Sequence, residues 1–141
     1  MDSIAPRPPT LTLLRDRPVG ELRVLVADDN PLSRELMREH LELSGYAVDC
    51  AADGQQAADM ASTGRYGLLL LDVNMPRLDG VEVVGRVRKL MSAGALRVIV
   101  MTADRLGRRR VELDAAGIDA YLTKPVTLQR LDGEIDRLLA G

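Results

Sequence analysis

The sequence predicts a single α/β domain, a doubly wound parallel sheet with helices on both faces. Short apolar runs and amphipathic stretches alternate five times along residues 22–139, with short polar connections between them. The third apolar run, at residues 68–71, consists of leucines only, which is typical of a strand buried on both faces. Strands that alternate with helices through short connections form right-handed crossovers, and therefore a parallel sheet.

The first strand is predicted at Leu22–Ala27, a short and largely apolar run. Asn30 is a favourable N-cap and Pro31 suits the first helical position, so we expect a helix to begin there and to end at Gly45. Helical spacing assigns its buried face to Leu32, Leu36, Met37 and Leu41. His40 lies within this helix on no recognisable ligand pattern, and we interpret it as a structural histidine.

The second strand is predicted at Ala47–Ala51. A capping-box pattern at residues 53–56 opens an alanine-rich helix that ends at Gly64, and its small side chains allow close approach to the sheet. The leucine strand at residues 68–71 follows. A second capping box, at residues 79–82, begins the next helix. The predicted buried face of that helix is formed by Val81, Val84, Val87 and Met91.

The fourth strand is predicted at Val98–Met101 and the fifth at Asp119–Thr123. The helix between them, at about residues 105–116, has the weakest apolar pattern because a glycine and a group of arginines interrupt it. The arginines are Arg105, Arg108, Arg109 and Arg110. We interpret them as a solvated face, with a partner-docking surface as the alternative. Thr127 caps the last helix, whose apolar stripe is Leu128, Leu131, Ile135, Leu138 and Leu139.

The composition excludes several classes of function. A net charge of −2 and an aromatic content of three tyrosines argue against a nucleic-acid surface. No apolar run reaches the roughly 18 residues of a membrane helix, and the N-terminus lacks the layout of a signal peptide, which predicts a cytoplasmic protein. The single cysteine, Cys50, fits a reducing compartment. We expect one domain at residues 21–141, preceded by a proline-rich tail or linker at residues 1–20.

Polar side chains stand at the ends of four predicted strands: Asp28 and Asp29, Asp72, Thr102, and Lys124. The carboxyl ends of parallel strands meet at one edge of a sheet, so we expect these side chains to converge. Three neighbouring carboxylates repel one another and need a cation in addition to Lys124. Oxygen ligands with no His or Cys nearby suit Mg²⁺, with Mn²⁺ as an alternative, and disfavour Zn²⁺.

A divalent ion beside a carboxylate, a hydroxyl and an ammonium suits phosphoryl transfer. The ion and Lys124 would neutralise phosphoryl oxygens, Thr102 would donate a hydrogen bond, and a carboxylate oxygen would attack phosphorus in line. Asp72 is the best-placed nucleophile because it ends the central strand, whereas Asp28 and Asp29 are adjacent and can share a metal.

Four motifs occur in the order and spacing of one known family: Asp28-Asp29-Asn30-Pro31, Leu71-Asp72-Val73-Asn74-Met75-Pro76 with Asp79-Gly80, Met101-Thr102-Ala103, and Tyr121-Leu122-Thr123-Lys124-Pro125. On these motifs the chain, from about Arg23 to Leu139, resembles the receiver domain of two-component response regulators. The resemblance implies a five-stranded flavodoxin-like (βα)5 fold with strand order 2-1-3-4-5. It also implies a phosphoacceptor domain that is not an enzyme, beyond catalysis of its own phosphorylation and dephosphorylation.

The resemblance further implies a role for each acid. Asp72 is the phosphoacceptor, and Mg²⁺ is held by Asp29, Asp72 and the backbone carbonyl of Asn74. Asp28 acts mostly through a metal-bound water. Asn74 and Asp104, each two residues beyond a motif residue, occupy positions that tune the rate of dephosphorylation.

For the remaining motif residues the resemblance implies a conformational switch. Thr102 is the switch hydroxyl, Lys124 binds the phosphoryl group, and a cis peptide is expected before Pro125. Tyr121 is the switch aromatic, which turns inward as Thr102 moves toward the phosphoryl group. Ordinary packing of Tyr121 on the sheet is the alternative interpretation, because aromatic residues favour strands in general.

The implied phosphodonor is a phosphohistidine on a sensor histidine kinase or on a histidine phosphotransfer domain. Its helices are expected to dock on the first helix and on the loop at Pro125 and Val126. The face formed by the fourth helix, fifth strand and fifth helix is the candidate surface for a homodimer or an output partner. Two origins stay open: a stand-alone regulator, or a module excised from a hybrid sensor kinase that acts as a phosphorelay intermediate.

Three other functions fit parts of this sequence. A phosphatase of the haloacid-dehalogenase type needs a second acid two residues after its nucleophile, and Asn74 cannot protonate a leaving group. A flavodoxin-like cofactor protein needs phosphate donors in its first loop, where Asp28 and Asp29 would repel phosphate. A phosphorylation-independent scaffold remains the alternative of another class, although such proteins usually lose the acid or lysine positions that this sequence keeps.

Overall fold

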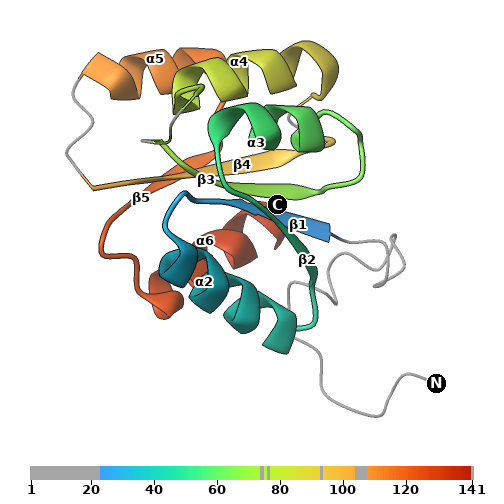
Figure 1. Ribbon diagram of the computed structural model, residues 1–141, viewed down its shortest axis with the longest axis vertical. Helices are drawn as coiled ribbons and strands as arrows, with labels where there is room; N and C mark the ends of the chain where they lie inside the picture. The colour runs from blue at the N-terminus through green and yellow to red at the C-terminus, as the bar shows by residue number, and fades with distance from the viewer. Residues whose placement is uncertain (1–22, 74, 76, 93, 104–107, 141) are drawn as a thin grey trace.

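The computed structural model describes residues 23–73, 75, 77–92, 94–103 and 108–140, apart from the side chains of residues 108, 109 and 140. The predicted tail at residues 1–20 lies outside the described residues, as do Asn74, Asp104 and Arg105. With the labels of Figure 1, the elements in chain order are β1 (Arg23–Ala27), α2 (Pro31–Leu43), β2 (Ala47–Ala51), α3 (Gly54–Ala61), β3 (Leu68–Asp72), α4 (Gly80–Leu90), β4 (Arg97–Thr102), α5 (Arg108–Ala116), β5 (Ala120–Thr123) and α6 (Leu128–Ala140).

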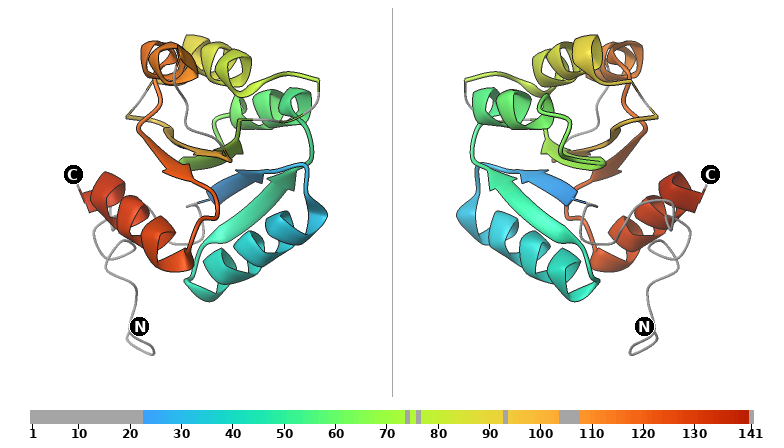
Figure 2. Two further views of the ribbon diagram at one scale, coloured as in Figure 1. Left: turned by 90° about the vertical axis from the view of Figure 1, so that its left-hand side faces the viewer. Right: turned by 90° about the vertical axis from the view of Figure 1, so that its right-hand side faces the viewer.

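The five strands form one parallel sheet in the order β2-β1-β3-β4-β5, which confirms the predicted fold class. Helices α3, α4 and α5 cover one face of the sheet, and α2 and α6 cover the other (Figures 1 and 2). Along the part of the chain that the structure describes, no helix is both long enough and apolar enough to cross a membrane.

The leucine run lies on the central strand and contributes to both cores. Leu69 and Leu71 join the cluster under α3, α4 and α5, while Leu68 and Leu70 join the cluster under α2 and α6. Side chains of a strand alternate between the two faces, so a strand that is covered on both sides needs an uninterrupted apolar run. The leucine run is followed by Asp72, which is the last residue of β3 and therefore lies at the carboxyl edge of the sheet.

Side-chain caps fix the helix starts that position the site. The Asn30 side chain accepts hydrogen bonds from the backbone N–H groups of Leu32 and Ser33, and Pro31 is the first residue of α2. Asp79 begins α4 with a complete capping box. Both caps were predicted, because the Asn-Pro pair and the capping-box spacing are local signals that need no tertiary contact.

The predicted buried faces are only partly correct. Leu32 and Leu36 of α2 are 69% and 56% exposed, and Leu128 of α6 is 45% exposed. Leu36 and Leu128 line an open groove between α2 and the start of α6, and the buried side of α2 runs through Met37 and Leu41. In α4 the buried face runs through Val83 in addition to Val84 and Val87, and the predicted members Val81 and Met91 are only partly buried.

Gly54 is the point where α3 meets the loop that follows β3. A Cβ atom at this position would lie 1.8 Å from the carbonyl oxygen of Leu78 and 2.6 Å from its carbonyl carbon. Both atoms belong to the backbone, so no rotamer change could relieve the contact. The absence of a side chain at Gly54 therefore lets the loop that carries Met75 and Leu78 pack on the N-terminus of α3.

Replacing Gly54 by alanine is expected to lower the free energy of unfolding by about 1–3 kcal/mol, the usual effect of overpacking a rigid site. Gly85, in the interior of α4, is the matched control, because a Cβ there meets nothing within 4 Å. Gly85→Ala should instead raise the stability by about 0.5–1 kcal/mol through helix propensity. Urea denaturation measures both changes, and effects of the same sign in the two variants would contradict this account.

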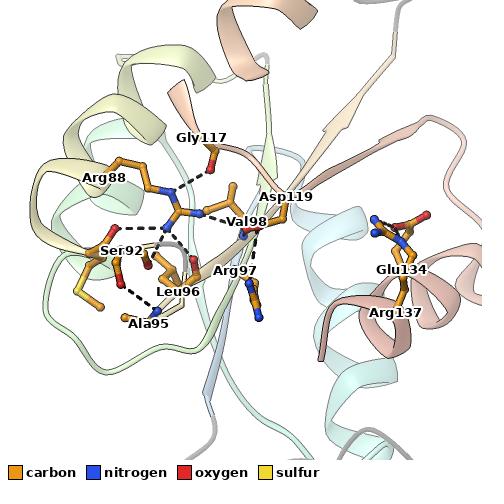
Figure 3. Close-up of polar contacts among 11 residues, drawn as sticks. Arg88, Ser92, Ala95, Leu96, Arg97, Val98, Gly117, Asp119, Glu134 and Arg137 are labelled. Atoms are coloured by element: carbon orange, nitrogen blue, oxygen red, sulfur yellow. Dashed lines mark hydrogen bonds and ion pairs between the residues drawn. The ribbon is translucent and has the colours of Figure 1, made fainter. Parts of the chain in front are cut away.

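At the opposite edge of the sheet, the largely buried guanidinium of Arg88 joins three elements (Figure 3). Its Nε donates to the carbonyl of Gly117 at 2.9 Å, and its Nη1 donates to the carbonyl of Leu96 at 2.7 Å. Its Nη2 lies 3.1 Å from the Asp119 carboxylate, which also accepts from the backbone N–H of Val98 at 2.7 Å. The end of α4, the start of β4 and the segment before β5 are thereby tied together.

Candidate functional site

Three carboxylates lie together at the carboxyl edge of the sheet. One ligand oxygen from each of Asp28, Asp29 and Asp72 lies within 4.8 Å of the others. Asp28 and Asp72 are buried, whereas Asp29 is exposed. The convergence predicted for these acids follows from the fold, because β1 and β3 are adjacent parallel strands that end side by side.

The loop after β1 is held by backbone contacts around Asp28. The Asp28 N–H donates to the carbonyl of Ala51 at 3.1 Å, and the Asp28 carboxylate accepts from the Asn30 N–H at 2.9 Å. The guanidinium of Arg34 donates to the Asp28 carbonyl at 2.7 Å. This role of Arg34 could not be predicted, since a single arginine on a helix carries no signal that its side chain contacts the preceding loop.

Lys124 reaches the cluster from the end of β5. Its Nζ lies 3.0 Å from the Oδ2 atom of Asp72, and the two form an ion pair. The backbone N–H of Lys124 donates to the carbonyl of Thr102 at the end of β4, and the peptide bond between Lys124 and Pro125 is cis. Thr102 is itself buried. The structure thus brings Asp28, Asp29, Asp72, Thr102 and Lys124 to one edge.

Among the residues that the structure describes, charge in this cluster is unbalanced, since three carboxylates face one ammonium. Burial raises the pKa of the Asp28 carboxyl above its ordinary value of 3.8, and the neighbouring Asp72 and Asp29 carboxylates add to that rise. The Asn30 N–H and the Lys124 ammonium act in the opposite direction. A carboxyl whose ionisation is disfavoured among other acids needs a cation, and the oxygen-only donor set fits a hard divalent ion such as Mg²⁺.

Replacing Asp28 by asparagine is expected to stabilise the metal-free protein at pH 7 by about 1 kcal/mol, within the range of typical stabilising substitutions. The pKa of Asp28 is higher in the folded protein than its ordinary value of 3.8. Below pH 3.8 the carboxyl is protonated in both the folded and the unfolded state, and its ionisation costs no stability. As the pH rises from 3.8 through the folded-state pKa, the unfolded state ionises more readily and the free energy of unfolding falls. Asparagine keeps an oxygen that can accept from the Asn30 N–H.

The pH dependence separates this effect from a general change in packing. In EDTA, urea denaturation of wild type and Asp28→Asn should give a stability difference that shrinks as the pH falls from 7 toward 4. Asp29→Asn, which changes an exposed acid of the same cluster, should give a smaller difference. Destabilisation by Asp28→Asn at pH 7 would contradict the prediction.

Tyr121 lies on edge strand β5, in register with Val100 of β4. Its ring is half-buried against the core under α3, α4 and α5, and the Arg110 guanidinium carbon lies 4.2 Å from the ring centroid. Thr102 stands two residues beyond Val100, so its side chain points to the same face of the sheet. The switch pair implied by the resemblance therefore shares one face across adjacent strands.

An apolar groove of about 750 Å³ leads from the cluster along α2. We call it the α2–α6 groove. It is lined by Leu36, Met37, His40 and Leu43 of α2, by Pro125 and Val126 of the loop before α6, and by Leu128, and it reaches Asp28 and Lys124. His40, predicted to be structural, pairs through Nε2 with Asp132 of α6 at 2.8 Å and so bridges the two helices that border the groove.

The chain is similar to known proteins in both sequence and fold. A family model of the response regulator receiver domain matches residues 24–136. The response regulator MprA of Mycobacterium avium (strain 104) is 45% identical over 120 residues, which cover 84% of this chain and 51% of that protein. The chain therefore spans about half the length of the curated relatives that it matches.

Two solved structures are informative about this type of site. The receiver domain of a sensor histidine kinase from Pseudomonas aeruginosa, with a magnesium ion coordinated in its active site cleft, has a TM-score of 0.76 and 30% identity, covering 85% of this chain and 98% of that one. The response regulator TrrA from Thermotoga maritima, in complex with Mg(2+)-BeF, has a TM-score of 0.73 and 34% identity, covering 83% of this chain and 98% of that one.

Proposed function

The chain belongs to the response regulator receiver domain family, and from this premise we propose that it is a phosphorylation-dependent signalling switch. It takes a phosphoryl group from a phosphohistidine onto Asp72 with Mg²⁺ and then changes its partner-binding face. The observation that carries the proposal is the environment of the Asp72 carboxylate. It is buried, 3.0 Å from the Lys124 ammonium, and clustered with two further acids.

The metal is proposed to bind through Asp29, Asp72 and the backbone carbonyl of Asn74, with Asp28 acting mostly through a bound water. The magnesium sites of related receiver structures support this choice of ion, and Mn²⁺ is the alternative. When bound, such an ion stabilises the negative charge of the transferring phosphoryl group. The bound ion would also supply a positive charge beside the Asp28 carboxylate, whose ionised form is disfavoured by burial.

In the transfer step, an oxygen of Asp72 attacks phosphorus in line. A phosphorus–oxygen bond forms as the phosphorus–nitrogen bond to the donor histidine breaks, and the leaving imidazole keeps the electron pair of the broken bond. Lys124 stabilises the charge on the phosphoryl oxygens, and the Thr102 hydroxyl donates a hydrogen bond to one of them. The Tyr121 ring turns inward as Thr102 moves toward the phosphoryl group. Asn74 and Asp104 tune the lifetime of the phosphoaspartate.

The donor is a sensor histidine kinase or a histidine phosphotransfer domain, and we propose that its helices dock in the α2–α6 groove. The groove joins the site residues Asp28 and Lys124 to an apolar surface. Leu36 and Leu128 on that surface are strongly exposed, as is Leu32 nearby on the first turn of α2. Exposed leucines around a functional site are typical of a protein–protein contact. A partner helix laid along α2 would bring its phosphohistidine to the end of the groove at Lys124.

The place of this domain in a pathway has two candidate forms. Similarity to MprA supports a response regulator, and similarity to the receiver of a sensor histidine kinase supports a phosphorelay module of a hybrid kinase. In both forms the α5, β5 and α6 face is the proposed surface for a homodimer or an output partner. We expect no nucleic-acid contact by this domain, and a cytoplasmic setting suits the lone thiol of Cys50.

The proposal is tested by direct phosphorylation. After incubation with Mg²⁺ and acetyl phosphate, intact mass spectrometry should show one added phosphoryl group, and EDTA should prevent the addition. Beryllofluoride with Mg²⁺ should shift backbone amide NMR signals around Asp72 and Thr102. If neither an adduct nor binding of the mimic is observed, the switch is refuted, and the phosphorylation-independent scaffold becomes the favoured function.

A further inference from the structure

Helix α5 is held to the rest of the domain by few apolar contacts. Among its described side chains, at residues 110–116, only Leu113 is buried, and Val111 is 69% exposed. The helix lies beside α4 on the same face of the sheet (Figure 1). Elements with few buried apolar side chains need little free energy to open locally or to shift. The polar contacts of α5 therefore strongly influence the position of this helix on the domain.

Two contacts hold the ends of α5 in different ways. At its C-terminal end, Gly117 has a φ of +108° and its carbonyl accepts the 2.9 Å hydrogen bond from Arg88. At its N-terminal end, the guanidinium of Arg110 lies 4.2 Å from the centroid of the Tyr121 ring. The same guanidinium is 3.9 Å from Asp114, one helical turn further on. The Arg110 contact joins α5 directly to an aromatic ring on the neighbouring strand.

The ring stands between α5 and the phosphorylation site. Tyr121 pairs with Val100, and Thr102 pairs with Thr123, so Tyr121 and Thr102 are diagonal neighbours on one face of the sheet. The side chain of Arg110 is 58% exposed, which places the contacted ring face near the molecular surface. A ring that turned inward toward Thr102 would leave Arg110 and lose the contact.

We propose that Arg110 is a positioning residue that holds the Tyr121 ring in its surface position and so opposes the phosphorylated conformation. The inference rests on the proposed function, because it needs a site whose occupation moves Thr102 and Tyr121. A cation over an aromatic face at an exposed position contributes a modest free energy, equivalent to about a two- to fivefold change in an equilibrium. An inhibitory contact of this size makes activation harder without preventing it.

The test compares beryllofluoride binding, in the presence of Mg²⁺, between wild type and Arg110→Gln. A ligand that selects a minor conformation binds more tightly when that conformation is more populated. Arg110→Gln should therefore bind the mimic about two- to fivefold more tightly. Arg110→Lys keeps a cation and should fall between the two. Asp114→Asn is the matched control: it removes the helix ion pair, leaves the cation over the ring, and should not bind more tightly than wild type.

A double-mutant cycle separates positioning from a general loosening of α5. In a Tyr121→Ala background, Arg110→Gln should leave the affinity for the mimic unchanged, since the ring that it positions is gone. Equal affinities of wild type and Arg110→Gln would overturn the inference while the proposed function stands, and so would tighter binding that persists without Tyr121. A wild-type protein that does not bind the mimic would overturn both.

Discussion

Asp72→Asn is expected to abolish phosphorylation by acetyl phosphate, so that no mass increase is detected under conditions that modify the wild type fully. Asparagine has nearly the same shape as aspartate, but its amide lacks the charged oxygen that attacks phosphorus. It also removes the carboxylate that pairs with Lys124 at 3.0 Å. Replacing one carboxylate oxygen by an amide nitrogen should thus eliminate the reaction rather than slow it.

The matched control is Asp53→Asn. Asp53 follows β2 at the same edge of the sheet, but it lies outside the acidic cluster and serves as the N-cap of α3. Asparagine is an equally good N-cap, so this variant should fold and be phosphorylated like wild type. Continued stoichiometric phosphorylation of Asp72→Asn, or loss of phosphorylation in Asp53→Asn, would refute the assignment of Asp72 as the acceptor.

Unfolding would be a trivial reason for lost phosphorylation, and the charge balance argues against it. In the described part of the site, Asp72 is one of three acids that lie near Lys124, so its neutralisation removes like-charge repulsion from Asp28 and Asp29 as well as the attraction of Lys124. We expect the melting temperature of metal-free Asp72→Asn to stay within a few degrees of wild type. Circular dichroism on the samples used for mass spectrometry checks this directly.

The fold and the cluster could be predicted from the sequence because both depend on local signals. The leucines at 68–71 identify a strand buried on both faces, and the caps at Asn30 and Asp79 set where the next helices begin. Once the strands are parallel, their carboxyl ends share one edge. The meeting of Asp28 with Asp72 then follows from topology, without knowledge of any side-chain contact.

Contacts that depend on packing between distant elements could not be predicted. Helical spacing alone assigned Leu32, Leu36 and Leu128 to buried faces, whereas all three are exposed and two of them, Leu36 and Leu128, line the α2–α6 groove. The Arg88 network joins residues about thirty positions apart, and no periodicity relates an arginine late in α4 to an acid before β5. Sequence patterns assign no role to Arg88 and place Asp119 at the start of the fifth strand, although β5 begins one residue later, at Ala120.

Arg88→Met is expected to lower the free energy of unfolding by about 3–5 kcal/mol, the largest stability change that we predict. Methionine fills much of the volume of the arginine stem but offers no donor. The Asp119 carboxylate would lose its nearest cationic partner, and the carbonyls of Gly117 and Leu96 would each lose a hydrogen bond. Removing one partner of a buried pair leaves the other charged and poorly solvated, which accounts for the size of the effect.

Arg137 on α6 provides the matched control (Figure 3), because it pairs with Glu134 one turn earlier at 2.6 Å but is 59% exposed. Arg137→Met should change the stability by less than about 1 kcal/mol, as is usual for exposed pairs. Arg88→Lys should recover little of the loss, since an ammonium cannot reach acceptors spread around a planar guanidinium. Urea denaturation of these variants measures the difference, and equal losses for Arg88→Met and Arg137→Met would mean that burial does not govern the strength of the Arg88 pair.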